Sequence, residues 1–260
     1  MRIREFACEC VDVGISGNWI YGIAKAHKAA GKHAAHLADT NDDNALASEL
    51  ADPQLVLVAV GEVTLQDTVK NIPSQWSDKL ALLQNELLPK DYAHIDNPTV
   101  ISVWFEKKKG QDSKPLIPSP AYGPQSQLLV DALNALDIPA RSVASAEAMN
   151  FELVVKNVYI VTTNIAGLRV GGDVGTLWKE HETFARDVAN DVIDIQEALT
   201  EQAYDRDALI AAMLEAFEGD PEHKCMGRSA PARLARAIAH ADNFGLSTIT
   251  LRAIAQETQS

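Results

Sequence analysis

The sequence lacks a surplus of positive charge, a long apolar run and an obvious leader segment. Acidic residues outnumber basic ones by 36 to 23, and the net charge is −13 at pH 7. Nucleic acid and anionic membranes would repel such a chain, so we expect neither as a partner. No run of about 18 apolar residues exists, so no transmembrane helix is expected. The opening residues MRIREF do not resemble a secretory signal.

Cysteine is also scarce, and its spacing argues against both disulfides and a metal site. The three cysteines are Cys8, Cys10 and Cys225. Cys8 and Cys10 stand too close for an easy bridge within one strand, and an odd count fits reduced thiols in a cytoplasmic protein. Together with His223 they do not match a zinc-binding spacing, so no metal is expected.

The first 145 residues alternate short apolar runs with amphipathic segments. Hydrophobic content is 47 % and charged content 23 %, as in ordinary globular proteins. The alternation predicts strands at 10–16, 33–38, 55–60, 80–83, 99–105 and 140–143, and helices at 18–30, 43–50, 64–71 and 125–136. Residues 107–124, rich in Pro, Gly and Lys, are predicted to form an exposed hairpin or loop. Strand–helix alternation of this kind predicts a parallel sheet with right-handed crossovers.

From about residue 146 the strand-like runs give way to long helical patterns. These patterns cover 147–168, 175–199, 204–218 and 229–243, and the last is followed by the helix stop Asn-Phe-Gly. The predicted fold class is therefore α/β. We expect an N-terminal Rossmann-like parallel-sheet domain over residues 1–145, then an all-helical C-terminal domain over 146–260 for substrate binding and dimerisation.

The turn after the first predicted strand is a candidate cofactor site. Its glycines stand at 14, 17 and 22, which departs from the usual G-x-G-x-x-G spacing. Backbone N–H groups at the start of the next helix could still bind a pyrophosphate. The candidates are Gly14, Ser16, Gly17 and Asn18. The alternative is that these glycines only make turns.

Two further positions fit a dinucleotide. Asp39 closes the second predicted strand, where a carboxylate would bind the adenosine ribose and favour NAD over NADP, since no arginine follows at 40–43. Asn85 follows the strand at 80–83, and ligands of open α/β sheets bind beyond the carboxyl ends of strands. Asn85 could equally cap the following turn.

A polar stripe interrupts the apolar helix predicted at 147–168. Lys156, Ile160 and Asn164 are spaced by four residues and so share one face. Lys156 therefore stands where a core residue is expected, and a buried ammonium is costly unless it has a partner or a role. The alternative is that Lys156 extends to water at the edge of the helix.

Together these motifs resemble the ketopantoate reductase family, whose helical domain is like that of 6-phosphogluconate dehydrogenase. The resemblance covers most of the chain in order and spacing. It rests on the N-terminal dinucleotide fold, the strand ending Leu-Leu-Gln-Asn85, and the helix bearing Lys156 and Asn164. It implies that Lys156 is the general acid, that Asn164 contacts substrate, and that Asn85 lies near an NAD or NADP cofactor.

The chain also departs from the family pattern. Ile160 replaces a further asparagine, and Glu86 follows Asn85 where the family has glycine. The segment that should supply a substrate serine and glutamate offers Ser229 and Arg228, which we take as substrate-binding candidates, and no clear glutamate.

The leading hypothesis is an NAD(P)-dependent oxidoreductase that reduces a small 2-oxo acid or related carbonyl in the interdomain cleft. A possible homodimer in the cytoplasm is expected. One alternative is a non-catalytic binding or assembly protein that keeps the fold with a degenerate cofactor site. Another is a dehydrogenase for a larger or acidic substrate, recruited by Arg228 and the lysines at 107–109.

Overall fold

The computed structural model describes residues 10–13, 55–62, 64–106 and 114–259. The chain divides into two compact units, Met1–Glu152 and Leu153–Ser260. We call them the sheet unit and the helical unit, and each is described by itself. The predicted helices at 18–30 and 43–50 and the predicted strand at 33–38 lie outside the described residues.

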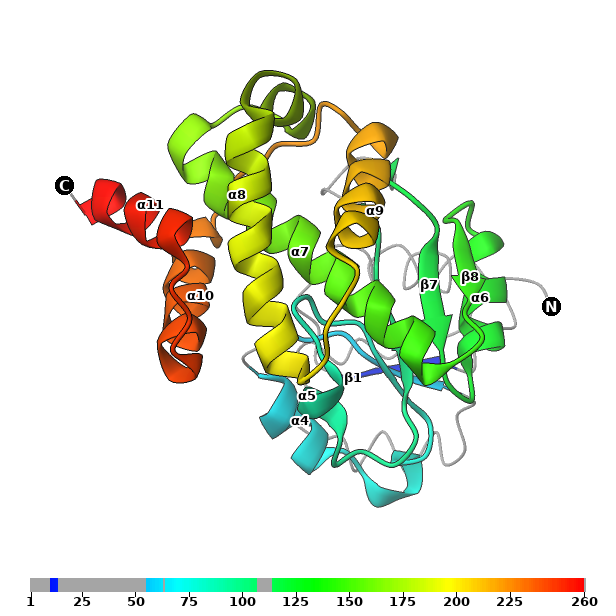
Figure 1. The fold of residues 1–260 in the computed structure, drawn as a ribbon. Coiled ribbons are helices and arrows are strands. Elements are labelled where there is room, and N and C mark those ends of the chain that lie inside the picture. Colours follow the sequence, from blue (N-terminus) through cyan, green and yellow to red (C-terminus); the bar gives the residue numbers. More distant parts are fainter. Residues whose placement is uncertain (1–9, 14–54, 63, 107–113, 260) are drawn as a thin grey trace. The chain divides into compact units, whose positions relative to one another are not determined.

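The sheet unit is built on a six-stranded sheet in the order β1-β2-β3-β4-β7-β8 (Figure 1). Its first four strands are mutually parallel. The six strands are β1 (Cys10–Val13), β2 (Leu55–Val58), β3 (Leu80–Leu82), β4 (Thr99–Ile101), β7 (Ser119–Tyr122) and β8 (Ala140–Ser142). A separate two-stranded ribbon joins β5 (Phe105–Glu106) to β6 (Lys114–Pro115).

The inner strands of the sheet, β2, β3 and β4, are buried along their whole length. All four residues of β2 are buried, as a continuous apolar run predicts. The described helical segments of this unit are α4 (Leu65–Asn71), the 3₁₀ helix Ser74–Trp76, α5 (Pro89–Tyr92) and α6 (Ser126–Asn134). The buried face of α6 packs in one cluster with β2, β4 and β7 through Leu129, Leu133, Leu55, Ile101 and Ala121.

The expectation of an all-parallel sheet is wrong at β7. This strand lies within the segment predicted to be an exposed loop, yet its first three residues are buried and it runs antiparallel to β4. Its sequence, Ser-Pro-Ala-Tyr, has no apolar run to mark it. The backbone N–H of Trp104 donates to Ser119 Oγ at 2.9 Å, so a buried polar side chain is satisfied within the sheet unit. The predicted strand at 99–105 accordingly ends at Ile101, and Phe105 pairs in the ribbon.

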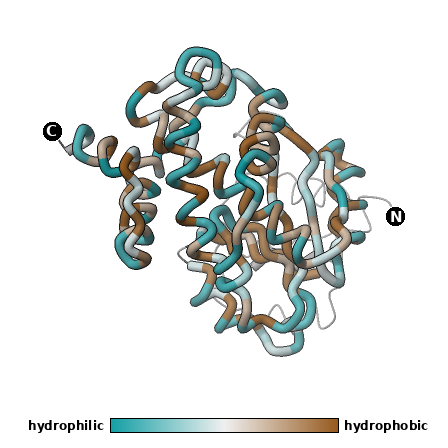
Figure 2. The backbone as a smooth tube through the Cα atoms, viewed as in Figure 1, coloured by the Kyte–Doolittle hydropathy of each residue, from teal (hydrophilic) through white to brown (hydrophobic). Residues whose placement is uncertain are grey.

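Four long helices of the C-terminal half are confirmed, and a fifth was not predicted. They are α7 (Ala146–Val170), α8 (Val174–Thr200), α9 (Arg206–Gly219), α10 (Ala230–Phe244) and the additional α11 (Ile249–Gln259). α7 starts in the sheet unit and continues into the helical unit from Leu153. Along the tube of Figure 2, hydrophobic and hydrophilic residues alternate on α8, α10 and α11, as expected for helices with one buried face. α7 is buried over most of its middle and has no such polar face.

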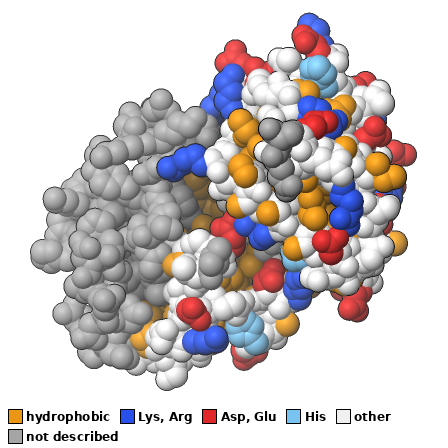
Figure 3. Space-filling model, turned by 90° about the vertical axis from the view of Figure 1, so that its left-hand side faces the viewer, with side chains coloured by type: hydrophobic (Ala, Val, Ile, Leu, Met, Phe, Trp, Pro, Cys, Tyr) orange, Lys and Arg blue, Asp and Glu red, His pale blue; other side chains and the backbone are white. Residues whose placement is uncertain are grey.

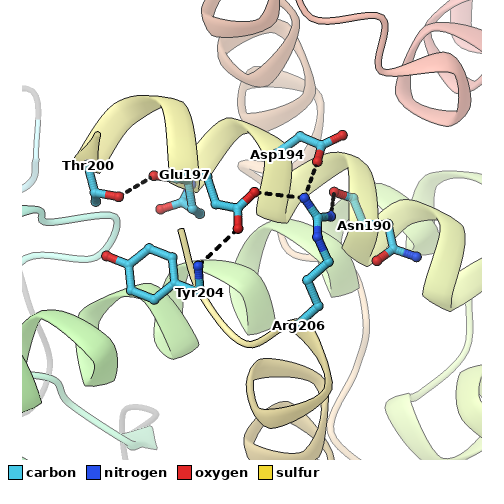
Figure 4. A network of polar contacts seen from close by, with 7 residues as sticks. Asn190, Asp194, Glu197, Thr200, Tyr204 and Arg206 are labelled. Carbon is cyan, nitrogen blue, oxygen red and sulfur yellow. Dashed lines mark hydrogen bonds and ion pairs between the residues drawn. The ribbon is translucent and has the colours of Figure 1, made fainter. Parts of the chain in front are cut away.

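Within the helical unit, α8 is the element beside which α9, α10 and α11 pack. Asp173 caps its first turn by accepting from the N–H of Thr176 at 2.9 Å. The α8–α9 turn is held by Arg206, which donates to Asp194 at 2.5 Å and to Glu197 at 2.7 Å (Figure 4). No helix in the described part of the chain is both long enough and apolar enough to cross a bilayer.

Candidate functional site

Lys156 lies on α7, within the helical unit, and its side chain is half-buried. Its Nζ is 5.6 Å from the centre of the Tyr159 ring, a distance suited to a cation–π contact. Burial, and secondarily the charge of Arg233, lower the pKa of Lys156 from 10.5 to about 7. An ammonium with such a pKa can give up its proton near neutral pH, as a general acid must.

Arg233 is the residue that sequence reasoning missed. It stands in the second turn of α10, and its Nη1 donates to Asn164 Oδ1 on α7 at 3.0 Å. Its charge also acts on Lys156. Arg233 therefore connects the two polar positions of the α7 stripe. No signal in the sequence pointed to this contact, because Asn164 and Arg233 stand 69 positions apart.

The segment before α10 packs closely on α7. A Cβ added at Gly167 would lie 2.9 Å from both Cys225 Cβ and Met226 Cβ, so only glycine permits this approach. Gly227 is also near the stripe, since a Cβ there would lie 3.9 Å from Asn164 Oδ1. Gly167, one turn beyond Asn164, thus allows the segment 225–229 to lie beside the polar stripe.

The two substrate-binding candidates in that segment are more exposed than Asn164, which is half-buried. Arg228 and Ser229 are both exposed, and Ser229 is the N-cap residue of α10. The carbonyl oxygen of Ser229 accepts from the N–H of Arg233 at 2.9 Å, so Ser229 begins the helix that carries Arg233. Roles for Arg228 and Ser229 in substrate binding stay predictions.

Cys225 is buried in this segment, and its thiol has low reactivity. Desolvation is the main cause that raises the pKa of its thiol to about 11, so the reactive thiolate is rare at neutral pH. Among the described residues, no group of three His, Cys, Asp or Glu side chains could hold a metal ion.

In the sheet unit, Asn85 is exposed in the turn that follows β3. The preceding residue, Gln84, is buried and fixes this turn to the end of β2: its Nε2 donates to Val58 O at 2.6 Å and to Val60 O at 3.3 Å. Glu86 has φ 59°, in the left-handed region that glycine adopts without cost. Asn85 therefore stands beyond the carboxyl ends of β2 and β3, and its role near a cofactor stays a prediction.

The remaining cofactor candidates cannot be placed. Gly14, Ser16, Gly17, Asn18 and Asp39 lie outside the described residues. Their roles, and the preference for NAD over NADP, stay predictions. So does the recruitment of an acidic substrate by the lysines at 107–109, which are likewise outside the described part.

The described surface carries side chains of both signs of charge. On the face drawn in Figure 3, blue Lys and Arg side chains are interspersed with red Asp and Glu side chains over the described residues. Other arginines of the helical unit follow the same pattern, since Arg169, Arg186 and Arg252 each pair with a carboxylate. Arg233 donates to the amide oxygen of Asn164.

Several solved structures share the fold of this chain. The 2-dehydropantoate 2-reductase of Porphyromonas gingivalis W83 matches with a TM-score of 0.56 at 13 % identity, covering 80 % of this chain and 73 % of that one. The 2-dehydropantoate 2-reductase of Methylococcus capsulatus matches with a TM-score of 0.57 at 11 % identity, covering 80 % and 74 %. D-mandelate dehydrogenase, in a ternary structure with NADH and anilino(oxo)acetate, matches with a TM-score of 0.52 at 12 % identity, covering 78 % and 73 %.

Comparison by sequence finds no such relation. No family model matches the chain, and no curated protein matches it. The likeness is therefore one of fold: a parallel-dominant sheet followed by helices, as in the ketopantoate reductases. The predicted fold class is confirmed, with the correction at β7 given above.

Proposed function

We propose that this chain is an NAD(P)-dependent oxidoreductase that reduces a small 2-oxo acid or a related carbonyl compound, with Lys156 as general acid. The observation that carries the proposal is the half-buried Lys156, whose pKa of about 7 is set by burial and by Arg233. The fold adds support, because structures that share it include 2-dehydropantoate 2-reductases and a dehydrogenase solved with NADH.

The described end of the sheet suits a nicotinamide cofactor. The turn bearing Asn85 lies at the carboxyl ends of parallel strands and is held there by Gln84. When bound, a reduced nicotinamide supplies a hydride to the carbonyl carbon of the substrate. Asn85 would orient it, and the glycine-containing turn near residues 14–18 would bind its pyrophosphate.

The proton in this reaction comes from Lys156. As the carbonyl carbon gains a hydride, the C=O π electrons move to oxygen, and the developing alkoxide takes a proton from the Lys156 ammonium. The products are a hydroxy acid, the oxidised nicotinamide and a neutral amine at Lys156. Asn164 would hold a substrate oxygen through its amide N–H groups, since its Oδ1 already accepts from Arg233.

A specific pH dependence follows. Because reduction needs the ammonium form, kcat/KM for reduction should fall as pH rises through about 7, the pKa of Lys156 in the free protein. In the oxidation direction the neutral amine is needed, so kcat/KM for oxidation should rise as pH rises through about 7.

The first experiment is a titration of the purified protein with NADH and NADPH, following nicotinamide fluorescence and the melting temperature. Micromolar binding is expected, after which 2-oxo acids are screened for oxidation of the cofactor. Lys156→Met should lower kcat by about a hundred-fold or more, the usual loss for a general acid, and leave cofactor affinity unchanged. Lys179→Met, at an exposed lysine of α8, is the control and should keep full activity.

The second candidate function is a binding or assembly protein that keeps the fold without catalysis. It is motivated by the irregular glycine spacing at 14, 17 and 22 and by Ile160 in the stripe. The absence of any response to either nucleotide, in a protein that melts cooperatively, would favour it and reject the reductase. A homodimer and a cytoplasmic location stay predictions, the first of which light scattering can test.

A further inference from the structure

We infer that Tyr159 is a positioning residue for Lys156, whose ammonium its ring holds in place and favours in the charged form. The use of this contact in catalysis rests on the proposed function. The contact itself belongs to the helical unit, and it can be tested without a cofactor or a substrate.

Lys156 and Tyr159 are neighbours on α7. Residues three positions apart on a helix lie on one face, so their side chains can meet. The Nζ of Lys156 is 5.6 Å from the centre of the Tyr159 ring, within the range of about 6 Å over which an aromatic face attracts an ammonium. That face carries partial negative charge. The ring therefore offers the ammonium an electrostatic contact that the neutral amine does not use.

The ring of Tyr159 is itself held by neighbours from other elements. Only 3 % of Tyr159 is exposed. Phe217 of α9 packs against it edge to face, with the ring centres 5.6 Å apart and the planes at 67°. The ring of His223, in the segment between α9 and α10, is tilted against it at 6.3 Å. A ring packed so closely cannot turn without displacing these neighbours, so its position does not depend on a ligand.

Burial acts on Lys156 in two opposite ways. It is the main cause that lowers the pKa of Lys156 to about 7, because the ammonium loses solvation. It also strengthens the attraction between the ammonium and the ring, because water screens that attraction less. Tyr159 thus offsets part of the cost of burial and keeps a larger fraction of Lys156 charged near neutral pH. The charged form is the one that a general acid must hold.

Other charged groups around this contact are common to wild type and to variants at Tyr159. Arg233 of α10 acts on Lys156 and lowers its pKa further. His223, beside the Tyr159 ring, has its Nδ1 3.7 Å from Asp220 Oδ2. A substitution confined to Tyr159 leaves all of these side chains in the protein. The difference from wild type therefore measures what the ring contributes.

The alternative is that Tyr159 only fills the core of the helical unit. Its replacement by leucine would then cost stability and leave the titration of Lys156 unchanged. Trp178 of α8 provides a matched comparison. Its ring packs against Phe217 at 6.3 Å and lies 4.7 Å from Cζ of Arg186, so it belongs to the same aromatic cluster but contacts a different cation.

The test is a measurement of the pKa of Lys156 from the carbon-13 shift of its Cε against pH, in the full chain labelled at lysine. The signal is assigned by its absence in Lys156→Met. Tyr159→Leu should lower this pKa by about 1, as expected for the loss of a desolvated cation–π contact. Tyr159→Phe keeps the aromatic face and should leave the pKa within about 0.3 of wild type. Trp178→Leu should leave it unchanged while lowering the melting temperature.

The pH profile of activity gives a second readout. In Tyr159→Leu the fall of kcat/KM for reduction should occur about one pH unit lower than in wild type. Activity at pH 8 should then drop about ten-fold, while activity at pH 5 should change little. Tyr159→Phe should follow the wild-type profile. If the pKa of Lys156 shifts as expected but no nucleotide binds, the ring contact stands and the proposed reductase does not.

A second variant keeps the test decisive if Tyr159→Leu folds poorly. Tyr159→pentafluorophenylalanine keeps the shape of the ring, and its fluorines withdraw the negative charge from the face. It should lower the pKa of Lys156 at least as much as leucine does. The inference is overturned if Lys156 titrates as in wild type in either variant, or if Tyr159→Phe or Trp178→Leu lowers the pKa as much as Tyr159→Leu.

Discussion

Replacing Lys156 by Met should make the protein more stable, and the gain should depend on pH in a defined way. Lys156 is half-buried on α7, and its pKa falls from 10.5 to about 7 in the folded chain. The charged form is therefore disfavoured by folding. Methionine has a similar length and no charge, so it fills the same space without that cost.

The magnitude follows from the pKa. A fall from 10.5 to about 7 corresponds to about 5 kcal/mol at 1.36 kcal/mol for each pKa step. That figure is an upper limit, because Lys156 keeps part of its side chain in contact with water and can bend toward it. We expect Lys156→Met to raise the free energy of unfolding by about 2 kcal/mol at pH 6.

The direction of the pH effect is fixed by proton binding. Between about pH 7 and pH 10.5 the unfolded chain holds a proton on Lys156 that the folded chain has lost, so wild-type stability from this group rises with pH. Below pH 7 both states are charged and the full cost is present. The advantage of Lys156→Met should accordingly be largest at pH 6 and should be small by pH 10.

Urea unfolding followed by circular dichroism at pH 6, 8 and 10 measures this difference, with Lys179→Met as the exposed control. The control should change the unfolding free energy by less than about 0.5 kcal/mol at each pH. A Lys156→Met variant that is less stable than wild type at pH 6, or whose advantage does not shrink by pH 10, would refute the assignment of a disfavoured ammonium at this position.

Three further predictions concern the packing of the helical unit. Gly167→Ala should lower the free energy of unfolding by about 1–3 kcal/mol, because its Cβ would meet Cys225 Cβ and Met226 Cβ at 2.9 Å; thermal unfolding measures the loss. Asp191→Ala should cost about 1 kcal/mol, since Asp191 Oδ2 accepts from the N–H groups of Thr250 and Leu251 at the start of α11. Asp191→Asn should be at least as stable as wild type at pH 7, because desolvation raises the pKa of Asp191 and disfavours its charged form. The advantage of Asp191→Asn should shrink as pH falls, and an advantage that grows in acid would contradict this account.

The parts of the fold that sequence patterns predicted are those whose burial leaves a periodic trace. β2 is an unbroken apolar run because both of its faces are covered. α8 and α10 carry apolar residues at helical spacing, and glycine ends α10 at Gly245 in the left-handed conformation. Such elements can be recognised one at a time, without knowledge of their neighbours.

The parts that were missed depend on partners distant in sequence. β7 is Ser-Pro-Ala-Tyr, and it becomes a strand only because β4 and β8 pair with it. α11 begins where it does because Asp191, on α8, satisfies its first N–H groups. Neither feature is encoded in the local pattern of the segment itself.

In the candidate site too, the residues that follow a local pattern were predicted, and the residue that depends on a distant partner was not. The α7 stripe was visible because Lys156 and Asn164 interrupt an apolar helix at a helical spacing. Arg233 was not, because its contact with Asn164 joins residues 69 positions apart. A charged residue on an amphipathic helix looks like any other until its partner is known.

The burial of Cys225 has a practical consequence for the study of this protein. Its thiol lies in the segment that packs on Gly167, and its raised pKa keeps it protonated at neutral pH. Alkylation therefore requires the segment to detach first, so the labelling rate measures how often this segment opens. With Cys8 and Cys10 changed to serine, one mass measurement per time point would report how often the segment lifts from α7.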